Sequence, residues 1–394
     1  MHALRFLTAG ESHGPALTAI LEGLPAGLAV SAADIRRDLA RRQRGAGAGG
    51  RMAIEQDQAQ ILGGVMDGRT TGAPVALLIP NRDHANWQGQ AVPAFTTPRP
   101  GHADLAAAIK YGFDDLRLAL ERASARETAA RVAVGALCRA YLEAFGIRLG
   151  GWVSAIGGVS ADLGAILFEK RIERALDSDV ACPDPEAAAR MRAAIQQAGE
   201  QGETAGGVIE AAALGVPAGL GSHVHWDRRL TARLAAALAS IPSVKGVEIG
   251  EAFAGAAQPG SRVQDPIRLQ DGRVLRPSDR CGGIEGGITN GQPVLVRVAL
   301  KPVATTHRTQ PSVDLAAGRE AETKYERSDI CPVPRAVVVV EAMLAFVVAE
   351  ALQEKLGGDS LAEQQARFAT LRAPTIESLK QRGEPRVFWP APPA

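Results

Sequence analysis

Residues 63–75 read GGVMDGRTTGAPV, and residues 282–294 read GGIEGGITNGQPV. The two segments share seven of thirteen positions, and each leads into an apolar stretch typical of a strand. A second pair of similar segments precedes them in the same order, LPAGL at 24–28 and VPAGL at 216–220. Chance similarity among 43 glycines is the alternative, but two ordered matches favour an internal duplication. The sequence therefore predicts two similar halves, each with strands, a helix and a glycine-rich hairpin.

The two matches lie at different offsets, 192 residues for the first pair and 219 for the second, which indicates an insertion in the second copy. We expect one domain over residues 1–394, with similar halves at about 1–150 and 205–360. A peripheral helical insert is expected near 160–203, where 184–201 is an alanine-rich amphipathic stretch. A C-terminal tail is expected from about residue 362.

The composition is that of an ordinary globular protein, with 46% hydrophobic residues, 22% charged residues and a net charge of +1. This balance predicts no general attraction to nucleic acid or to a membrane, so any anion site must be a local cluster. The longest apolar run, 336–349, is interrupted by Glu341. The N-terminus has no signal-peptide pattern, and four cysteines without CxxC spacing fit free thiols in a reducing cytoplasm.

The segment GESHG at residues 10–14 follows a short apolar run at 4–7. Glycines on both sides allow a tight turn and a close approach of the backbone to a ligand. His13 is then a candidate proton carrier, because histidine has the unperturbed side-chain pKa nearest to neutrality. The alternative for a five-residue match is an ordinary strand-to-loop turn with a surface histidine.

A helix is expected to begin after Ser31, where SAAD has the form of a capping box with Asp34 in place of glutamate. Its later part carries a group of cations that either suit a helix C-terminus or form an anion site: Arg36, Arg37, Arg41, Arg42 and Arg44. The chain continues as GAGAGGRM at 45–52, a loop that is either mobile or presents backbone N–H groups to an anion. Arg42 and Arg51 on its two sides favour the anion site.

Two further loops carry candidate site residues. Residues 96–104 read TTPRPGHAD, and their prolines prevent a helix, so Arg99 and His102 lie on a stiff loop. A histidine in such a loop is commonly a solvated turn residue, and proton transfer is the functional alternative. Lys301 ends a predicted strand at 294–300 and precedes small hydroxyl residues, which makes it a candidate anion contact.

Residues 122–128 read RASARET and lead into a long helix that is expected to end near Phe145, before Gly146. Ser124 and Glu127 have the spacing of a capping box. A helix N-terminus offers N–H groups and a positive potential to a phosphate, and Arg122 and Arg126 flank this one. The segment is therefore the strongest local candidate for phosphate binding.

Gathered in one pocket, the candidate cations would carry more positive charge than a protein holds without an anionic ligand. They are Arg42, Arg51, Arg99, Arg122, Arg126, Lys301 and Arg327. The small and hydroxyl residues beside them suit a flat phosphorylated cofactor. The chain has no Walker loop, no GxGxxG after a strand and no CxxC metal pattern. These residues predict an enzyme that acts on a polyanionic small molecule, with His13 and His102 as proton carriers and no metal.

The chain resembles the chorismate synthase family from residue 4 to about residue 361. Seven motifs in the family's order carry the resemblance: GESHG at 10–14, RRQRGAGAGGRM at 41–52, RPGHAD at 99–104, KYGFDD at 110–115, ERASARETAARVAVGAL at 121–137, GGIEGGITNGQP at 282–293 and RSDICPVP at 327–334. The resemblance implies an α+β fold, a layered sandwich of helices between antiparallel sheets with internal pseudo-duplication. It also implies a cytoplasmic homotetramer with no nucleic-acid or membrane partner.

The family converts 5-enolpyruvylshikimate 3-phosphate to chorismate by 1,4-elimination of phosphate and a ring hydrogen, and it requires reduced FMN without net redox change. By this resemblance the substrate's phosphate and carboxylates are held by five arginines: Arg42, Arg51, Arg99, Arg126 and Arg327. His13 would protonate the reduced flavin, and His102 would assist near the leaving phosphate. Ser12 and Asp329 would form the relay that removes the ring proton through the flavin.

The resemblance also assigns contacts to FMN, which are Arg122, Ala123, Ser124, Pro242, Ser243, Gly286, Lys301, Pro302, Val303, Ala304, Thr305 and Arg327. The glycine loop departs from the family, which usually has Tyr and Arg where this chain has Ala46 and Ala48. That departure removes one expected cationic contact. If the chain also reduces its flavin with NADPH, Arg42 and Ala48 are the expected nucleotide contacts.

Two other functions are weaker alternatives. A flavin reductase that uses NAD(P)H could employ the basic loop, but the chain has no dinucleotide fingerprint. A non-catalytic protein could bind nucleic acid through residues 36–51, but the near-zero net charge and the scarcity of aromatic residues argue against it.

Overall fold

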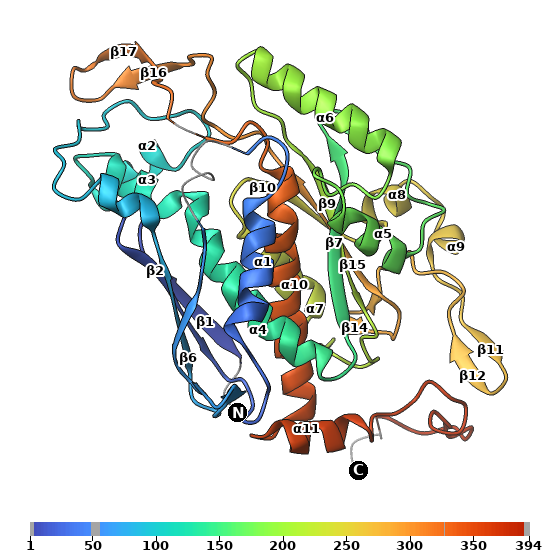
Figure 1. Ribbon diagram of the computed structural model, residues 1–394. Helices are drawn as coiled ribbons and strands as arrows, with labels where there is room; N and C mark the ends of the chain where they lie inside the picture. Colours follow the sequence, from blue (N-terminus) through green and yellow to red (C-terminus); the bar gives the residue numbers. More distant parts are fainter. Residues whose placement is uncertain (1–3, 49–55, 327, 390–394) are drawn as a thin grey trace, which may run out of the picture.

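The computed structural model describes residues 4–48, 56–326 and 328–389, and it has two antiparallel sheets on opposite sides of a helical layer (Figure 1). Across the first sheet the order is β1 (Arg5–Ala9), β2 (Ala16–Glu22), β6 (Val75–Pro80) and β3 (Gln60–Gly63). Across the second it is β10 (Val244–Ile249), β15 (Val294–Leu300), β9 (Gly207–Leu214), β7 (Arg148–Ile156) and β8 (Val159–Ser160). The central layer contains α1 (Ala32–Gln43), α4 (Thr128–Glu143), α7 (Leu230–Ala239) and α10 (Val333–Leu356). The expected α+β sandwich of helices between antiparallel sheets is confirmed.

The two halves of the chain present equivalent elements in the same order. The series β1, β2, α1, β3, β6, α4 corresponds to β7, β9, α7, β10, β15, α10. In both sheets the second strand lies between the first and the fourth, and the third lies beside the fourth. Each half also has a short hairpin before its fourth strand, β4 (Val65–Met66) with β5 (Arg69–Thr70), and β13 (Ile284–Glu285) with β14 (Ile288–Thr289).

The repeated sequence segments contact each other in the same way in both halves. The hydroxyl of Thr70 donates to the carbonyl of Pro25 at 2.6 Å, and the hydroxyl of Thr289 donates to the carbonyl of Pro217 at 2.7 Å. A Cβ on Gly64 would lie 2.4 Å from the carbonyl oxygen of Pro74, and the second half has the same close approach at its equivalent glycine. The shared Gly, Thr and Pro positions are therefore those that this hairpin needs to close on the turn that precedes the helix.

The second half begins earlier than residue 205, because its first strand is β7. β7 is paired on both sides, with β9 and β8, and Trp152 on it is fully buried, so residues 150–156 belong to the core of the second half. The strand reads RLGGWVSAI and lacks the alternation of polar and apolar residues that marks a half-buried strand. The true insertion is residues 157–206, between the first two strands of the second half, and it contains β8, α5 (Phe168–Leu176) and α6 (Pro185–Glu200).

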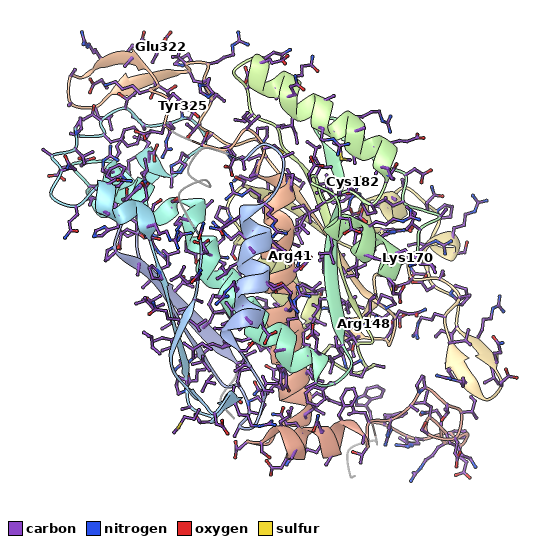
Figure 2. All side chains as sticks on the ribbon, in the orientation of Figure 1. Arg41, Arg148, Lys170, Cys182, Glu322 and Tyr325 are labelled. Carbon is purple, nitrogen blue, oxygen red and sulfur yellow. The ribbon has the colours of Figure 1, made fainter. Side chains whose placement is uncertain are left out.

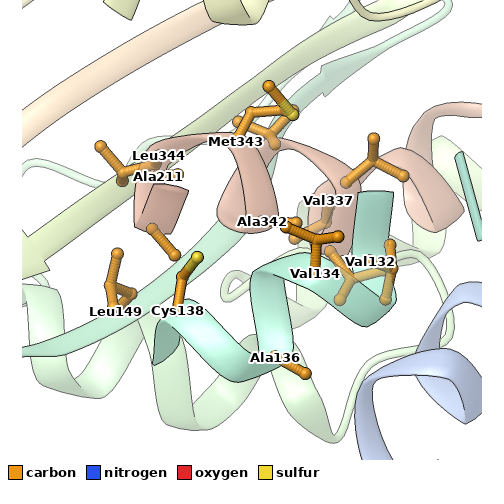
Figure 3. Packing of buried hydrophobic residues seen from close by; sticks show 14 of the residues in the cluster. Val132, Val134, Ala136, Cys138, Leu149, Ala211, Val337, Ala342, Met343 and Leu344 are labelled. Atoms are coloured by element: carbon orange, nitrogen blue, oxygen red, sulfur yellow. The ribbon is translucent and has the colours of Figure 1, made fainter. Parts of the chain in front are cut away.

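The centre of the molecule is the contact between α4 and α10, the equivalent long helices of the two halves (Figure 3). They approach closely because α4 has a glycine at the crossing: a Cβ on Gly135 would lie 2.3 Å from that of Ala342. α10 begins at Val333 and runs through the β-branched residues 337–340, because burial between the layers outweighs their weak helix propensity. By length and composition α10 could cross a membrane, but 78% of its most apolar window is buried within the described structure, as in a core helix.

A buried carboxylate ties this layer together. Glu341 on α10 is 0% exposed and accepts two hydrogen bonds of 2.7 Å from Arg41 of α1, which Figure 2 labels beside α10. It also accepts from Arg139 of α4 at 2.6 Å and from the backbone N–H of Gly151 on β7 at 2.8 Å. Burial opposes ionisation, but the two arginines outweigh it and hold the pKa of Glu341 below its ordinary value.

The remaining elements are short and lie around this core. They are the 3-10 turns η2 (Arg82–Asn86), η3 (Ala125–Glu127) and η4 (Trp226–Arg228), the helices α2 (Asp104–Tyr111), α3 (Arg117–Ala123), α8 (Ala252–Ala256), α9 (Gly260–Val263) and α11 (Leu361–Phe368), and the hairpins β11 (Arg268–Gln270) with β12 (Arg273–Leu275) and β16 (Pro311–Asp314) with β17 (Arg319–Glu322). The start of the expected tail is docked, because Gln364 of α11 is fully buried and accepts from the hydroxyl of Tyr141 at 2.7 Å. The β16–β17 hairpin rests on the 96–104 loop, where the N–H of Leu315 donates to the carbonyl of Thr96 at 3.0 Å.

Candidate active site

A cavity of about 670 Å³ lies where the two halves meet. Its wall is built from equivalent positions: the C-terminal ends of α1 and α7, and the N-terminal ends of α4 and α10. Fifteen of the predicted site residues line it, which are Ser12, His13, Arg42, Arg99, His102, Ala123, Ser124, Arg126, Pro242, Ser243, Lys301, Val303, Ala304, Thr305 and Asp329. Segments that are more than 300 residues apart in the sequence thus converge on one site.

Other predicted site residues are not brought to this cavity. Arg122 is not part of the cavity wall, and its guanidinium donates to the carbonyl of Thr8 at 3.1 Å. Gly286 lies in the turn of the β13–β14 hairpin, and neither Pro302 nor the exposed Ala48 is part of the cavity wall. Arg51 and Arg327 fall outside the described residues.

His13 is held firmly at the turn between β1 and β2. Its Nδ1 donates to Oε1 of Glu121 and its backbone N–H donates to Oε2, both at 2.7 Å, and its ring stacks on Trp87 with centroids 4.0 Å apart. The turn itself is fixed by Asn81, whose amide donates to the carbonyl of Gly14 at 2.7 Å. Burial opposes ionisation of Glu121, but the bonds from His13 lower the pKa of this carboxyl below its ordinary value.

His102 has a similar carboxylate partner. Its Nδ1 lies 2.5 Å from Oδ1 of Asp104, while Oδ2 of Asp104 accepts from Nε of Arg99 at 2.9 Å. Arg99 also donates to the hydroxyl of Thr305 at 3.1 Å. Burial opposes ionisation of Asp104, but the hydrogen bonds from His102 and Arg99 hold its pKa well below the usual range. Several N–H groups of the Arg99 guanidinium are therefore used to orient the His102–Asp104 pair.

A cluster of buried arginines occupies another part of the wall. Arg42 donates to the hydroxyl of Thr128 at 2.9 Å, and Arg126 donates to Oδ1 of Asn81 at 2.8 Å. Arg335, on the first turn of α10, forms an ion pair with Asp329 and donates to the carbonyl of Arg42 at 3.0 Å. Burial lowers the pKa of Arg42 to about 9, against the opposing effect of a nearby carboxylate.

Two lysines lie at the side of the cavity formed by the second half. Lys301 follows β15 and Lys245 lies on β10, and both line the cavity. Burial lowers the pKa of Lys301, and the like charge of Lys245 lowers it further. Ser243 beside them has φ +70, a strained conformation for a residue with a side chain, and its carbonyl accepts from the N–H of Lys301 at 2.9 Å. This arrangement suits an anionic group placed between the two ammonium groups.

The start of α4 differs from the predicted capping box. The hydroxyl of Ser124 accepts from the N–H of Arg126 at 3.3 Å and lies 3.0 Å from the hydroxyl of Ser12. The carboxylate of Glu127 turns away from Ser124 and accepts from the hydroxyl of Thr8 at 2.7 Å. The segment forms the 3-10 turn η3 before α4, so Ser124 and Arg126 face the cavity while Glu127 anchors the turn to β1.

Sequence reasoning missed five residues that shape the site: Asp57, Trp87, Glu121, Lys245 and Arg335. Glu121 is the first residue of the motif at 121–137, and Arg335 directly follows the motif at 327–334. Their position next to predicted site residues could therefore have identified both. Asp57 and Trp87 lie in stretches with no clear periodicity, and only their contacts reveal them.

A possible metal-ligand cluster lies outside this cavity, where ligand atoms of Asp265, Asp279 and Cys281 are within 4.8 Å of one another. Burial raises the pKa of Asp279 to about 6. Both carboxylates accept from backbone N–H groups, Asp265 from Cys281 at 2.9 Å and Asp279, through Oδ1, from Gly283 at 2.6 Å. Oδ2 of Asp279 is buried without a hydrogen-bond partner among the described residues. These bonds support the turn before β13.

The comparisons with known proteins agree with one another. Residues 4–353 match the family described as chorismate synthase. The chain is 55% identical over 371 residues to the chorismate synthase of Desulforudis audaxviator, covering 91% of this chain and 95% of that protein. It is 51% identical over 383 residues to the chorismate synthase of Aquifex aeolicus, covering 93% and 96%. A crystal structure of chorismate synthase matches with a TM-score of 0.77 and 44% identity, covering 94% of this chain and 97% of that one. This chain therefore belongs to the chorismate synthase family.

Proposed function

We propose that this chain is a lyase that forms chorismate from 5-enolpyruvylshikimate 3-phosphate, with reduced FMN as its cofactor. The observation that carries the proposal is that one cavity combines two carboxylate-held histidines with a group of buried arginines. The substrate has one phosphate and two carboxylates, and the planar fork of arginine binds such groups in a bidentate way. Family membership supplies the reaction class, and the cavity supplies groups suited to it.

The size and lining of the cavity support a phosphorylated flavin as a ligand beside the substrate. Its volume of about 670 Å³ is within the usual range for small-molecule sites. Lys245 and Lys301 would hold the phosphate, and apolar side chains such as Ile241 and Val339 would contact a flat ring. When bound, reduced FMN supplies an electron transiently, so that phosphate can leave without net redox change.

The chain's own residues then divide into two tasks. Arg42 and Arg126 bind the anionic groups of the substrate and orient it. Because Glu121 holds Nδ1 of His13, we propose that His13 exchanges a proton at Nε2. His102 acts near the leaving phosphate, while Ser12 and Asp329 form a relay that carries the ring proton away from the substrate.

Anaerobic turnover tests this function directly. We expect chorismate to form from the phosphorylated substrate with reduced FMN, with none consumed per product, and no turnover with oxidised FMN in air. Equal activity with oxidised FMN would refute the cofactor proposal. Adding NADPH to oxidised FMN without air tests whether the chain reduces its own flavin through Arg42 and Ala48.

Replacing Lys301 with methionine should weaken FMN binding by about 10- to 150-fold, because a hydrogen bond to a charged group contributes about 1.5–3 kcal/mol. Binding of riboflavin, which lacks the phosphate, should change by less than about twofold. Fluorescence titration of both flavins measures the two affinities. Lys170→Met on α5 is the matched control, because that lysine pairs with Glu173 outside the cavity. Equal losses for FMN and riboflavin would show that Lys301 does not contact the phosphate.

We also propose that the chain works in the cytoplasm as a homotetramer. The outer face of the first sheet supports self-association, because it exposes Leu7 by 73%, Ile20 by 48% and Leu62 by 61%. Register pairs Leu7 with Ile20, so these side chains form one apolar face. Light scattering of the purified protein gives the assembly mass, and Ile20→Lys should lower it.

A further inference from the structure

The carboxylate of Asp57 pairs with two arginines behind the cavity wall. Oδ1 of Asp57 accepts from Arg126 at 2.5 Å, and Oδ2 accepts from Arg42 at 3.3 Å. The two arginines come from separate segments, the last turn of α1 and the turn η3. All three residues are buried, with exposures of 3% for Asp57 and 4% for each arginine. A buried charge needs a partner of opposite sign, and Asp57 is a partner that these two arginines share.

The other arginines that line the cavity pair with different carboxylates. Arg99 pairs with Asp104 at 2.9 Å, and Arg335 pairs with Asp329. Among the described ion pairs of the cavity wall, Asp57 is thus the carboxylate that is divided between two guanidinium groups. The group formed by Arg42, Arg126 and Asp57 carries a formal charge of +1, which is half of what the two arginines would carry alone.

Asp57 acts from behind and does not meet the ligand. Arg42 and Arg126 line the cavity, whereas Asp57 does not, and its side chain is 0% exposed. Its backbone N–H donates to Oε1 of Gln43 at 3.2 Å, which fixes it to the end of α1. An anion in the cavity would therefore contact the two guanidinium groups on their cavity side, while Asp57 binds them on the opposite, buried side.

We propose that Asp57 is a positioning residue that aligns Arg42 and Arg126 and limits how tightly they hold an anionic ligand. The inference deepens the proposed function, on which it rests for the identity of the ligand as a phosphorylated one. Without Asp57 the charge of the group would rise to +2, so a phosphate would be attracted more strongly. The pair would also lose its alignment, so turnover would fall although binding had tightened. A residue with a merely structural role would not produce this combination.

The test uses Asp57→Asn in the full chain with inorganic phosphate as the probe. We expect phosphate to bind at least about tenfold more tightly than to the unaltered protein, as measured by calorimetry. We also expect a lower melting temperature without phosphate and a larger rise when phosphate is added, because the anion replaces the missing carboxylate. KM for the substrate should fall together with kcat. Folding only in the presence of phosphate would support the same conclusion.

Two further variants sharpen the result. Asp38→Asn removes a buried carboxylate that pairs with Arg139 at 3.1 Å outside the cavity, so it should lower stability without changing phosphate affinity. Asp57→Glu keeps the charge and should keep an affinity near that of the unaltered protein. Unchanged or weaker phosphate binding by Asp57→Asn, or equal tightening by Asp57→Glu, would overturn the proposal. Because phosphate binding is measured without substrate or flavin, these outcomes are separate from a failure of the proposed reaction.

Discussion

Replacing His13 with alanine is expected to lower turnover by about 10²- to 10⁴-fold, the range that a positioned general acid contributes. The side chain is prepared for proton transfer, because Glu121 holds Nδ1 and Trp87 packs against the ring. FMN should still bind, since the lysines proposed to hold its phosphate lie on the other half of the chain. Single-turnover rates and the flavin spectrum with substrate bound measure both effects.

The protein contains a matched control for this variant. His225 has the same type of contact, with Nδ1 2.8 Å from Oδ1 of Asp227, but it lies outside the cavity and is exposed. His225→Ala should therefore leave turnover unchanged. Near-normal turnover of His13→Ala, or its failure to fold, would show that the turn at residues 10–14 is structural.

Replacing Glu341 with alanine is expected to lower the free energy of unfolding by about 3–5 kcal/mol, because it leaves buried arginines without their partner. Arg41 and Arg139 both lose their bonds to this carboxylate, and the N–H of Gly151 loses its acceptor. Urea denaturation measures the difference. Glu354→Ala on the same helix is the control, because Glu354 pairs with Arg233 at the surface and should contribute at most about 1 kcal/mol.

The same network predicts a pH dependence. The pKa of Glu341 is lowered in the folded protein, so the unfolded chain takes up its proton first as the pH falls. The contribution is therefore complete above the ordinary carboxyl pKa and is lost as the pH falls through the lower folded value. Unfolding curves from neutral pH downwards should show a steeper loss of stability for the unaltered protein than for Glu341→Ala. Parallel losses in the two proteins would contradict the assignment.

The repeated glycine segments predicted the duplicated fold because their residues are required by contacts within one hairpin and the turn it closes on. A side chain at Gly64 would clash with a backbone carbonyl, and the hydroxyl of Thr70 donates to the carbonyl of Pro25. Both halves therefore keep the same residue types at these positions. Long-range packing leaves no such signature. β7 was missed because two glycines and small residues fill its sequence, and its burial comes from neighbours distant in the chain.

The candidate site was predicted from motifs, but its electrostatics were not. The surplus of arginines indicated an anionic ligand. That inference assumed that the arginines have no carboxylate partners within the protein. The structure instead supplies carboxylates such as Asp57 and Asp104, which neutralise part of that charge before any ligand arrives. Such partners could not be read from spacing, because Asp57 meets Arg126 across 69 residues.

The cavity walls come from equivalent ends of equivalent helices, yet the two halves no longer carry the same side chains there. Arg42 lies at the end of α1, whereas the end of α7 leads into Pro242 and Ser243 with lysines beside them. Two identical walls related by a twofold rotation would bind an asymmetric molecule equally well in two orientations. Because Arg42 faces the cavity from the end of α1 whereas Lys245 and Lys301 lie beside the end of α7, an anionic ligand would meet different cations in its two orientations and would favour one of them.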